Sequence, residues 1–210
     1  MSFAIRNTSY TVWFWIIFSI TSLCGIAFSM HYFSRAFPLV SVDLTMNRAQ
    51  ALEKASLNAH ELKIGPESFQ QAALFHTDEL AKLYIEFEAG DANTFKDIVS
   101  RHIYEPYVWQ VRHFAQGSKH EATFIFTPSG QKYGFLEVIP ETTSGAALAS
   151  HEAQKIAQTG ASEQWGINFS DYKLVDASQE VMLSKRVDHA FTYEKNNEHI
   201  GKATYRLRLV

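Results

Sequence analysis

Cysteine is almost absent from this 210-residue chain, which has a single one, Cys24. One cysteine cannot form an intrachain disulfide, and it cannot build a metal site from several thiolates. Basic residues are also too few and too scattered for a nucleic-acid binder, because the formal net charge is -3. The hydrophobic content of 46% is enough for a buried core, so the chain is not intrinsically disordered.

Charged residues are missing from one long stretch near the start of the chain. Between Arg6 and Arg35 there is no Asp, Glu, Lys or Arg, and the centre, Tyr10–Met30, is almost wholly apolar. A helix of this length crosses the roughly 30 Å hydrocarbon core of a bilayer. Tyr and Trp side chains crowd its first end, as they do at membrane interfaces. The sequence therefore predicts a transmembrane anchor in residues 1–35, with the lipid bilayer as its partner.

A cleaved signal peptide is the alternative for this segment. Ala27-Phe28-Ser29 has the small-x-small spacing of a cleavage site. The apolar stretch is longer than the 7–15 residues usual for a signal peptide, which favours a retained anchor. The sequence gives a weak signal for the orientation of the helix in the membrane, because one arginine lies at each end, Arg6 before it and Arg35 after it. We expect a cytoplasmic N-terminus and an extracytoplasmic soluble domain.

The rest of the chain contains a weak internal repeat. Its first copy begins with a helical stretch near Met46, which the Gly65-Pro66 pair ends. About 102 residues later a second helical stretch begins at Ser150, a good N-cap, with Glu152 in the first turn, and ends at Gly166. Alanines recur at matching positions of the two helices: Ala51, Ala55 and Ala59 in the first, and Ala153, Ala157 and Ala161 in the second.

Alternating apolar and polar residues after each helix predict antiparallel strands. We expect strands at 83–89, 107–114, 122–127 and 133–139 in the first copy, with a short helix at 94–102, and strands at 171–183, 188–194 and 202–209 in the second, the last two joined around Asn196-Asn197. The fold class is α+β: one transmembrane helix followed by two tandem modules, each a helix with an antiparallel meander. The expected domains are 1–35, 36–140 and 141–210, with a linker at 140–150.

Catalytic and metal-binding motifs are absent. The three His-Glu pairs, at His60, His120 and His151, lack the second histidine of a zinc-protease HExxH helix. Asp188 and His189 are adjacent in an expected strand, so their side chains should point to opposite faces and cannot form a dyad. The chain contains neither a GxSxG elbow nor a phosphate-binding glycine loop. We expect no cofactor and no catalytic residue in this chain.

One expected strand carries side chains that suit ligand binding. Tyr107, Trp109 and Arg112 are the candidate lining of a groove for a peptide or an anionic ligand. The alternative is an ordinary cross-strand pairing face. Arg112 and its neighbour His113 should diverge, because adjacent strand residues point to opposite faces.

Five stretches, which follow one another in order through residues 33–210, carry a resemblance to a known family that covers nearly all of this region. They resemble the N-terminal region of large bacterial CPBP-family intramembrane proteases, which are related to CAAX-prenyl-protease-like enzymes. The stretches are "FPLVSVDLTMNRAQALEKA", "PYVWQVRHF", "FTPSGQKYGF", "WGINFSDYKLV" and "RVDHAFTYEKNNEHIGKATYRLRLV". In that family a first membrane helix precedes a long soluble region, and a bundle of membrane helices then holds the protease centre.

The resemblance implies an accessory role rather than an enzyme. The family's protease centre uses a Glu-Glu-xxx-Arg motif, and this chain has no Glu-Glu pair. The resemblance thus implies a membrane-anchored, non-catalytic accessory domain of the bacterial inner membrane, partnered by a polytopic protease region or its peptide substrate. The apolar alternation of the last strand, "ATYRLRLV", running to Val210, fits a truncated or split form of a larger protein. The alternative is a single-pass PepSY-like or cystatin-like peptide-binding sensor.

Overall fold

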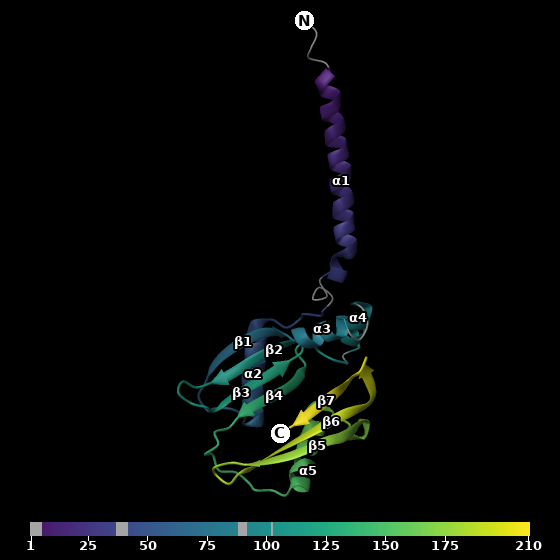
Figure 1. Ribbon diagram of the computed structural model, residues 1–210. Helices are drawn as coiled ribbons and strands as arrows, with labels where there is room; N and C mark the ends of the chain where they lie inside the picture. The colour runs from purple at the N-terminus through teal and green to yellow at the C-terminus, as the bar shows by residue number, and fades with distance from the viewer. Residues whose placement is uncertain (1–5, 37–41, 88–91, 102) are drawn as a thin grey trace. The chain divides into compact units, whose positions relative to one another are not determined.

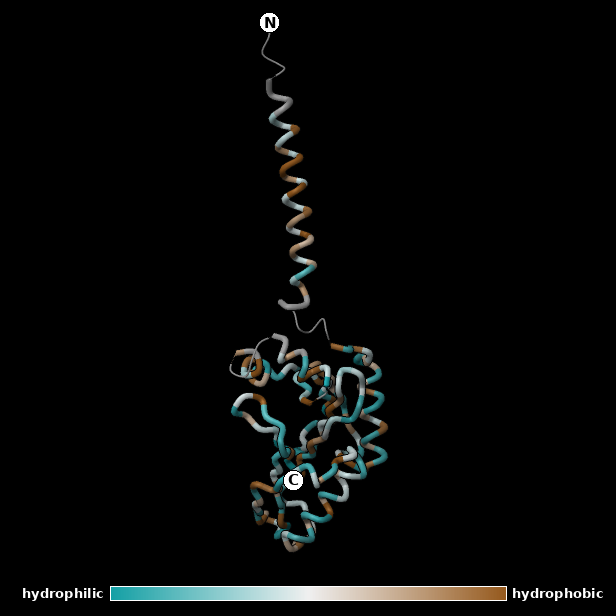
Figure 2. Tube along the Cα trace, turned by 90° about the vertical axis from the view of Figure 1, so that its right-hand side faces the viewer, coloured by the Kyte–Doolittle hydropathy of each residue, from teal (hydrophilic) through white to brown (hydrophobic). Residues whose placement is uncertain are grey.

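The computed structural model describes residues 6–36, 42–87, 92–101 and 103–210, and the chain divides into two compact units, Met1–Val42 and Asp43–Val210. The first unit contains helix α1 (Arg6–Ala36; Figure 1). Within α1, Tyr10–Phe33 forms 24 residues of mean hydropathy 1.9, and Figure 2 shows hydrophobic segments recurring along the helix. Among the described residues this is the one helix long and apolar enough to cross a membrane. This length and composition fit a membrane anchor and a signal sequence alike.

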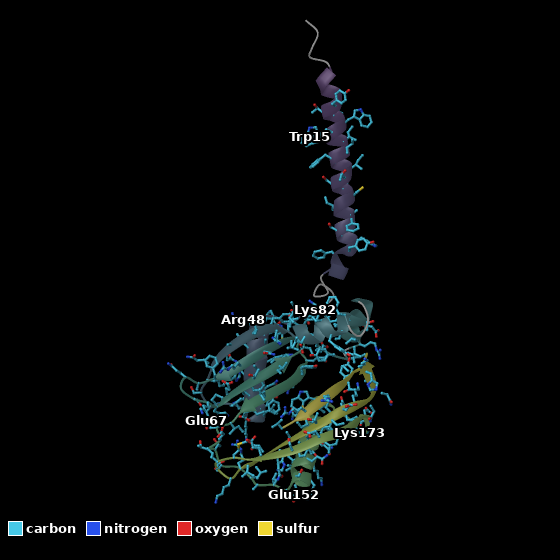
Figure 3. All side chains as sticks on the ribbon, in the orientation of Figure 1. Trp15, Arg48, Glu67, Lys82, Glu152 and Lys173 are labelled. Carbon is cyan, nitrogen blue, oxygen red and sulfur yellow. The ribbon has the colours of Figure 1, made fainter. Side chains whose placement is uncertain are left out.

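The side chains of α1 suit an apolar surrounding. Trp13, Trp15 and Phe18 are all more than half exposed, and Figure 3 shows Trp15 projecting from the helix. The hydroxyl of Thr21 donates a hydrogen bond of 2.9 Å to the carbonyl of Ile17 one turn earlier. The helix therefore satisfies this polar group internally, as a segment in lipid must.

The second unit is α+β, as predicted, and contains two antiparallel sheets. The first sheet has the order β1-β2-β3-β4, and helix α2 packs on one face of it (Figure 1). Two short helices lie in the connection between β1 and β2. The elements are α2 (Arg48–Leu62), β1 (Gln70–Thr77), α3 (Glu79–Phe87), α4 (Ala92–Ser100), β2 (Tyr107–Phe114), β3 (Glu121–Phe126) and β4 (Lys132–Val138).

The second sheet repeats this plan with one strand fewer. Its order is β5-β6-β7, and helix α5 packs against β6. The elements are α5 (Ser150–Trp165), a short 3-10 turn (Phe169–Asp171), β5 (Tyr172–Val181), β6 (Val187–Ile200) and β7 (Ala203–Leu209). A helix followed by an antiparallel meander therefore occurs twice, as expected, although both copies belong to one compact unit, Asp43–Val210.

Small residues allow each helix to approach its sheet closely. Ala51, Ala55 and Ala59 of α2 are buried against a core that includes Val111 and Phe124. In α5, Ala161 is buried, and the amides of two glutamines on the same helix, Gln154 and Gln158, donate to the Tyr193 hydroxyl at 3.0 and 3.1 Å. The repeated alanines thus mark the sheet-facing side of the first helix, and Ala161 does so in the second.

The helix ends follow local hydrogen bonding. Asn47 and Gln50 form a reciprocal capping box at the start of α2, with bonds of 3.0 and 2.9 Å. Gly166 ends α5 in the left-handed conformation, as the sequence indicated. The prediction that Ser150 is the N-cap of α5 is wrong. Ala149 occupies that position without a side-chain hydrogen bond, and Ser150 is the first helical residue.

Two secondary-structure predictions in the first copy need correction. Residues 83–89 were expected as a strand, but positions up to Phe87 belong to α3, whose first turn is stabilised by a 3.0 Å bond from the Ala81 amide to Asp78. Strand β1 was not anticipated. Exposed and half-buried residues alternate along β1, but the exposed face carries apolar residues such as Leu74. Apolar and polar residue types therefore do not alternate in the sequence.

The hairpin expected around Asn196-Asn197 is also placed differently. Both residues lie inside β6, where the register shifts between Glu194 and His199 and Asn197 has a φ of 59°. The turn between β6 and β7 falls instead at Gly201, also with a φ of 59°. Asparagine tolerates the left-handed region, which suits a bulge as well as a turn.

Candidate functional site

The three residues expected to line a groove do not share a surface. Tyr107 and Trp109 point to the α2 side of the sheet, where Tyr107 is buried and the Trp109 indole nitrogen donates to the Met46 carbonyl at 3.1 Å. Arg112 lies on the opposite face, exposed, paired with Glu121 and placed 5.2 Å above the Phe114 ring. Odd and even positions of a strand face opposite ways, so β2 separates Arg112 from the two aromatic residues.

The divergence expected for two adjacent pairs is confirmed. His113 is fully buried while Arg112 is exposed. Asp188 accepts a 2.6 Å bond from Arg186, whereas His189 is buried and its Nε2 donates to the Leu148 carbonyl at 3.1 Å. Asp188 and His189 therefore do not form a catalytic dyad.

Metal-binding side chains do not converge in the part of the chain that the structure describes, where no group of three or more His, Cys, Asp or Glu residues could hold an ion. His120 and Glu121 of the second His-Glu pair have separate partners. His120 contacts the Glu137 carboxylate at 2.8 Å, and Glu121 pairs with Arg112. Both carboxylates are therefore engaged by neighbouring side chains.

His113 is a fully buried histidine whose pKa departs strongly from its ordinary value. Its ring stacks on Phe69 at 4.0 Å between centroids, and its Nε2 lies 2.8 Å from the Gln71 amide nitrogen. That amide also donates to the Leu52 carbonyl, so Nε2 of His113 is the acceptor and Nδ1 carries the proton. Nδ1 is buried and has no hydrogen-bond partner in the described part of the chain. Burial lowers the pKa of His113 to about 4, which keeps the ring neutral at physiological pH.

Aromatic contacts join the two sheets. Phe135 on β4 stacks on Trp165 at the end of α5, at 5.5 Å between centroids, and Tyr104 lies 6.4 Å from Tyr205 on β7. We call these four residues and Tyr133 on β4 the seam. Among the residues that the structure describes, the buried Trp165 indole nitrogen and Tyr205 hydroxyl have no hydrogen-bond partner. Such orphaned polar atoms cost about 1–3 kcal/mol each, so the seam is polar but incompletely satisfied.

The pKa shifts of Asp78, Tyr104 and Tyr205 keep the carboxylate ionised and the two phenols protonated at neutral pH. Burial acts to raise the pKa of Asp78, but bonds from the Ala81 amide and the Tyr104 hydroxyl outweigh it, so the pKa is lowered. Burial and the 2.5 Å bond to Asp78 raise the pKa of Tyr104. Burial, followed by the charge of Glu198, raises the pKa of Tyr205 to about 12. Both phenols therefore stay protonated at neutral pH and are not bases.

Tyr84 on α3 ties the first sheet's helices to the second sheet. Its hydroxyl donates to the Ile200 carbonyl and accepts from the amides of Lys202 and Ala203, all at 3.1 Å. One phenol thus closes the turn between β6 and β7.

Replacing Tyr84 with phenylalanine should therefore destabilise the domain by about 1–3 kcal/mol, because the turn loses three hydrogen bonds to one hydroxyl. Urea denaturation followed by circular dichroism measures this loss. The matched control is Tyr172→Phe on β5, which removes a phenol hydroxyl from the same sheet away from the turn. Equal stabilities of the Tyr84 variant and the wild type would contradict the bracing role.

The free sheet edges are the other distinctive surface. Within the described residues β4 pairs with β3 alone and β7 with β6 alone. Five large apolar side chains in and just after β4 are at least 40% exposed: Tyr133, Phe135, Leu136, Val138 and Ile139. A hollow of about 490 Å³ lies along the C-terminal half of α5 and is lined mostly by polar residues. Another, of about 170 Å³, lies between α4 and the β6–β7 turn, and its mixed lining includes Tyr205 of the seam.

Comparison with known proteins adds no identification: no family model, no curated protein and no solved structure matches this chain. The candidate site therefore depends on the geometry alone. It consists of the seam and the exposed apolar edge of β4 beside it.

Proposed function

We propose that this protein is a membrane-anchored, non-catalytic domain that holds a polypeptide segment near the bilayer. The observation that carries this proposal is an apolar helix of 24 residues joined to an α+β domain with an exposed apolar sheet edge. Helix α1 supplies the anchor, and the edge supplies a surface suited to an extended chain.

The sequence resemblance extends the proposal to a particular setting. In that setting the domain lies on the extracytoplasmic side of a bacterial inner membrane and serves a CPBP-type intramembrane protease region, by presenting or gating its substrate. The raised pKa values of Tyr104 and Tyr205 support a non-catalytic role, because these phenols stay protonated at neutral pH and cannot act as bases.

A second candidate is a single-pass peptide-binding sensor of PepSY-like or cystatin-like type. The repeated helix-on-sheet module with open strand edges favours it. This candidate differs in its partner, since a sensor captures soluble peptides and does not need a polytopic membrane protein.

Affinity purification from solubilised bacterial membranes separates the two candidates. We expect the full chain, tagged at its C-terminus, to retain a polytopic protease region, identified by mass spectrometry. Recovery of soluble peptides alone would favour the sensor. The control is the same chain without residues 1–35, which tests whether retention needs the anchor. Cleavage of peptides by the purified chain without a partner would overturn both candidates.

A further inference from the structure

Helix α3 exposes more apolar surface than the other helices of the second unit. Leu80, Leu83 and Phe87 are 82%, 47% and 77% exposed, within a helix of nine residues. Among the described residues, α2 exposes one large apolar side chain, Leu57, α5 exposes one, Ile156, and α4 exposes none. The apolar surface of α3 therefore sets it apart from the helices around it.

The three exposed side chains form one face of α3, because they are three and four positions apart along the helix. Ile85 on the opposite face is buried, and the Tyr84 hydroxyl is bonded to the turn between β6 and β7. The helix is thus fixed to the domain on one side and apolar on the other. We call Leu80, Leu83 and Phe87 the α3 face. Exposed apolar patches of this kind mark contacts with proteins or membranes.

The covalent connection to α1 favours the membrane as the partner of this face. Helix α1 ends at Ala36, and the second unit begins at Asp43. The seven residue steps between them reach about 25 Å when fully extended. Under the proposed function the bilayer is therefore always within reach of the domain, whereas a second copy or a soluble partner has to arrive by diffusion.

The chain enters the second unit close to the start of α3. The carbonyl of Met46, near the entry, accepts a bond from the Trp109 indole nitrogen. The Trp109 ring lies 5.2 Å from the ring of Phe75, and β1 ends two residues further on, at Thr77. Helix α3 then begins at Glu79. The connection from α1 and the α3 face therefore meet at one end of the first sheet.

The charges of α3 favour insertion of apolar side chains over electrostatic attraction to lipid. Its sequence contains two acidic residues, Glu79 and Glu86, and one basic residue, Lys82. The Lys82 ammonium lies 3.8 Å from the Glu79 carboxylate, which balances its charge. An amphipathic helix can bury its apolar face at the boundary between headgroups and acyl chains. Contact through α3 should therefore not require anionic lipid.

We propose that the α3 face lies in the interfacial layer of the bilayer that α1 spans, so that the membrane holds the domain at two points. This inference rests on the proposed function, because it takes α1 as a retained anchor. The second sheet follows α3 through the bonds of Tyr84 to the β6–β7 turn. Contact of α3 with lipid thus sets which surface of the domain faces the membrane.

The test uses the full chain, labelled with bimane in detergent and reconstituted into phosphatidylcholine vesicles that contain a nitroxide-labelled lipid. The label is attached to Leu83→Cys in a Cys24→Ala background, because Cys24 is the one cysteine of the chain. Lipid nitroxides quench bimane on contact. An interfacial helix buries its apolar face roughly 5–10 Å deep, so the fluorescence of this label should fall roughly twofold or more.

The matched control is Leu183→Cys in the same background. Leu183 is 81% exposed in the turn between β5 and β6. The 14 residues of β6 separate this turn from the one that Tyr84 contacts, as Figure 1 shows. That is roughly 40 Å along the strand, so the Leu183 label should keep its fluorescence.

Charged variants locate the contact on α3. Leu80→Glu combined with Phe87→Glu should abolish quenching of the Leu83 label, because carboxylates resist transfer into an apolar layer. Leu57→Glu, which changes an exposed apolar residue of α2, should leave the quenching unchanged. These positions are exposed, and circular dichroism of each variant checks that the fold is kept.

The wild-type chain labelled at Cys24 reports on the anchor separately. Cys24 is exposed on α1, and a nitroxide deep in the acyl chains should quench its label. Quenching at Cys24 with equal quenching of the Leu83 and Leu183 labels would refute this inference and leave the proposed function standing. An unquenched Cys24 label would refute both.

Two further results would overturn the inference. The first is a Leu83 label that is shielded from aqueous iodide but not quenched by lipid, since a protein partner or a second copy would then cover the α3 face. The second is quenching that appears only when phosphatidylglycerol is added to the vesicles, because apolar insertion does not need anionic lipid.

Discussion

Replacing Ile17 and Ile20 in the middle of α1 with arginine is expected to release the protein from membranes. Each arginine at the centre of a membrane helix costs roughly 2.5–3.5 kcal/mol on insertion scales, so the pair removes most of the advantage of an apolar span. Both isoleucines are more than half exposed on α1, and the change should leave the α+β unit folded. The measurement is the fraction of chain that stays in the pellet after alkaline carbonate extraction.

The control for this experiment is leucine at both positions, which keeps the helix apolar and should keep the chain in the pellet. The same samples distinguish an anchor from a signal sequence. An anchor leaves the wild-type N-terminus intact in mass spectrometry, whereas cleavage near Ser29 yields a mature chain without the helix. Extraction of the uncleaved wild-type chain by carbonate would contradict the anchor.

Acidification is expected to destabilise the domain through His113. The pKa of this histidine is about 4 in the folded protein, against about 6.5 when the chain is unfolded. The unfolded state therefore binds the proton first, and stability that is fully present above pH 6.5 is lost as the pH falls toward 4. The shift corresponds to about 3 kcal/mol once both states are protonated. Urea denaturation at pH 7.5, 5.5 and 4 measures this loss.

The variant His113→Phe isolates this contribution from that of the carboxylates. Phenylalanine keeps a ring against Phe69 and does not titrate, so its stability should depend less on pH by about the amount given above. His60→Gln, an exposed change on α2, should keep the wild-type dependence. If the unfolding free energies of wild type and His113→Phe changed with pH in parallel, His113 would not be the cause of the acid destabilisation.

The spacing of apolar residues was enough to predict the secondary-structure elements that are long or that alternate strongly. The apolar run of α1, the strand at 107–114 and the helix that begins near Met46 follow directly from residue period. The Thr127–Gln131 turn between β3 and β4 also follows, because Gly130 supplies a φ of 88°. These features depend on neighbours a few residues apart, which sequence displays.

The candidate site could not be predicted in the same way. The sequence suggested a shared groove for Arg112, Tyr107 and Trp109 because they are close in the chain. In β2, however, Arg112 lies on one face of the sheet and the two aromatic residues lie on the other. The contact of Phe135 with Trp165 joins residues of different copies of the repeat, and no local pattern marks it. The open edge of β4 likewise became visible only once the partners of the strands were known.

The sequence by itself determined the apolar helix, the α+β class and the repeated order of helix and meander. Each follows from hydrophobic period and turn chemistry, which act over one or two turns of chain. Only the tertiary structure decided that 83–87 is helical, that Asn197 makes a bulge, and that β4 is left as an open apolar edge. Those outcomes depend on which distant surfaces compete for the same segment, and burial between distant residues outweighs local preference.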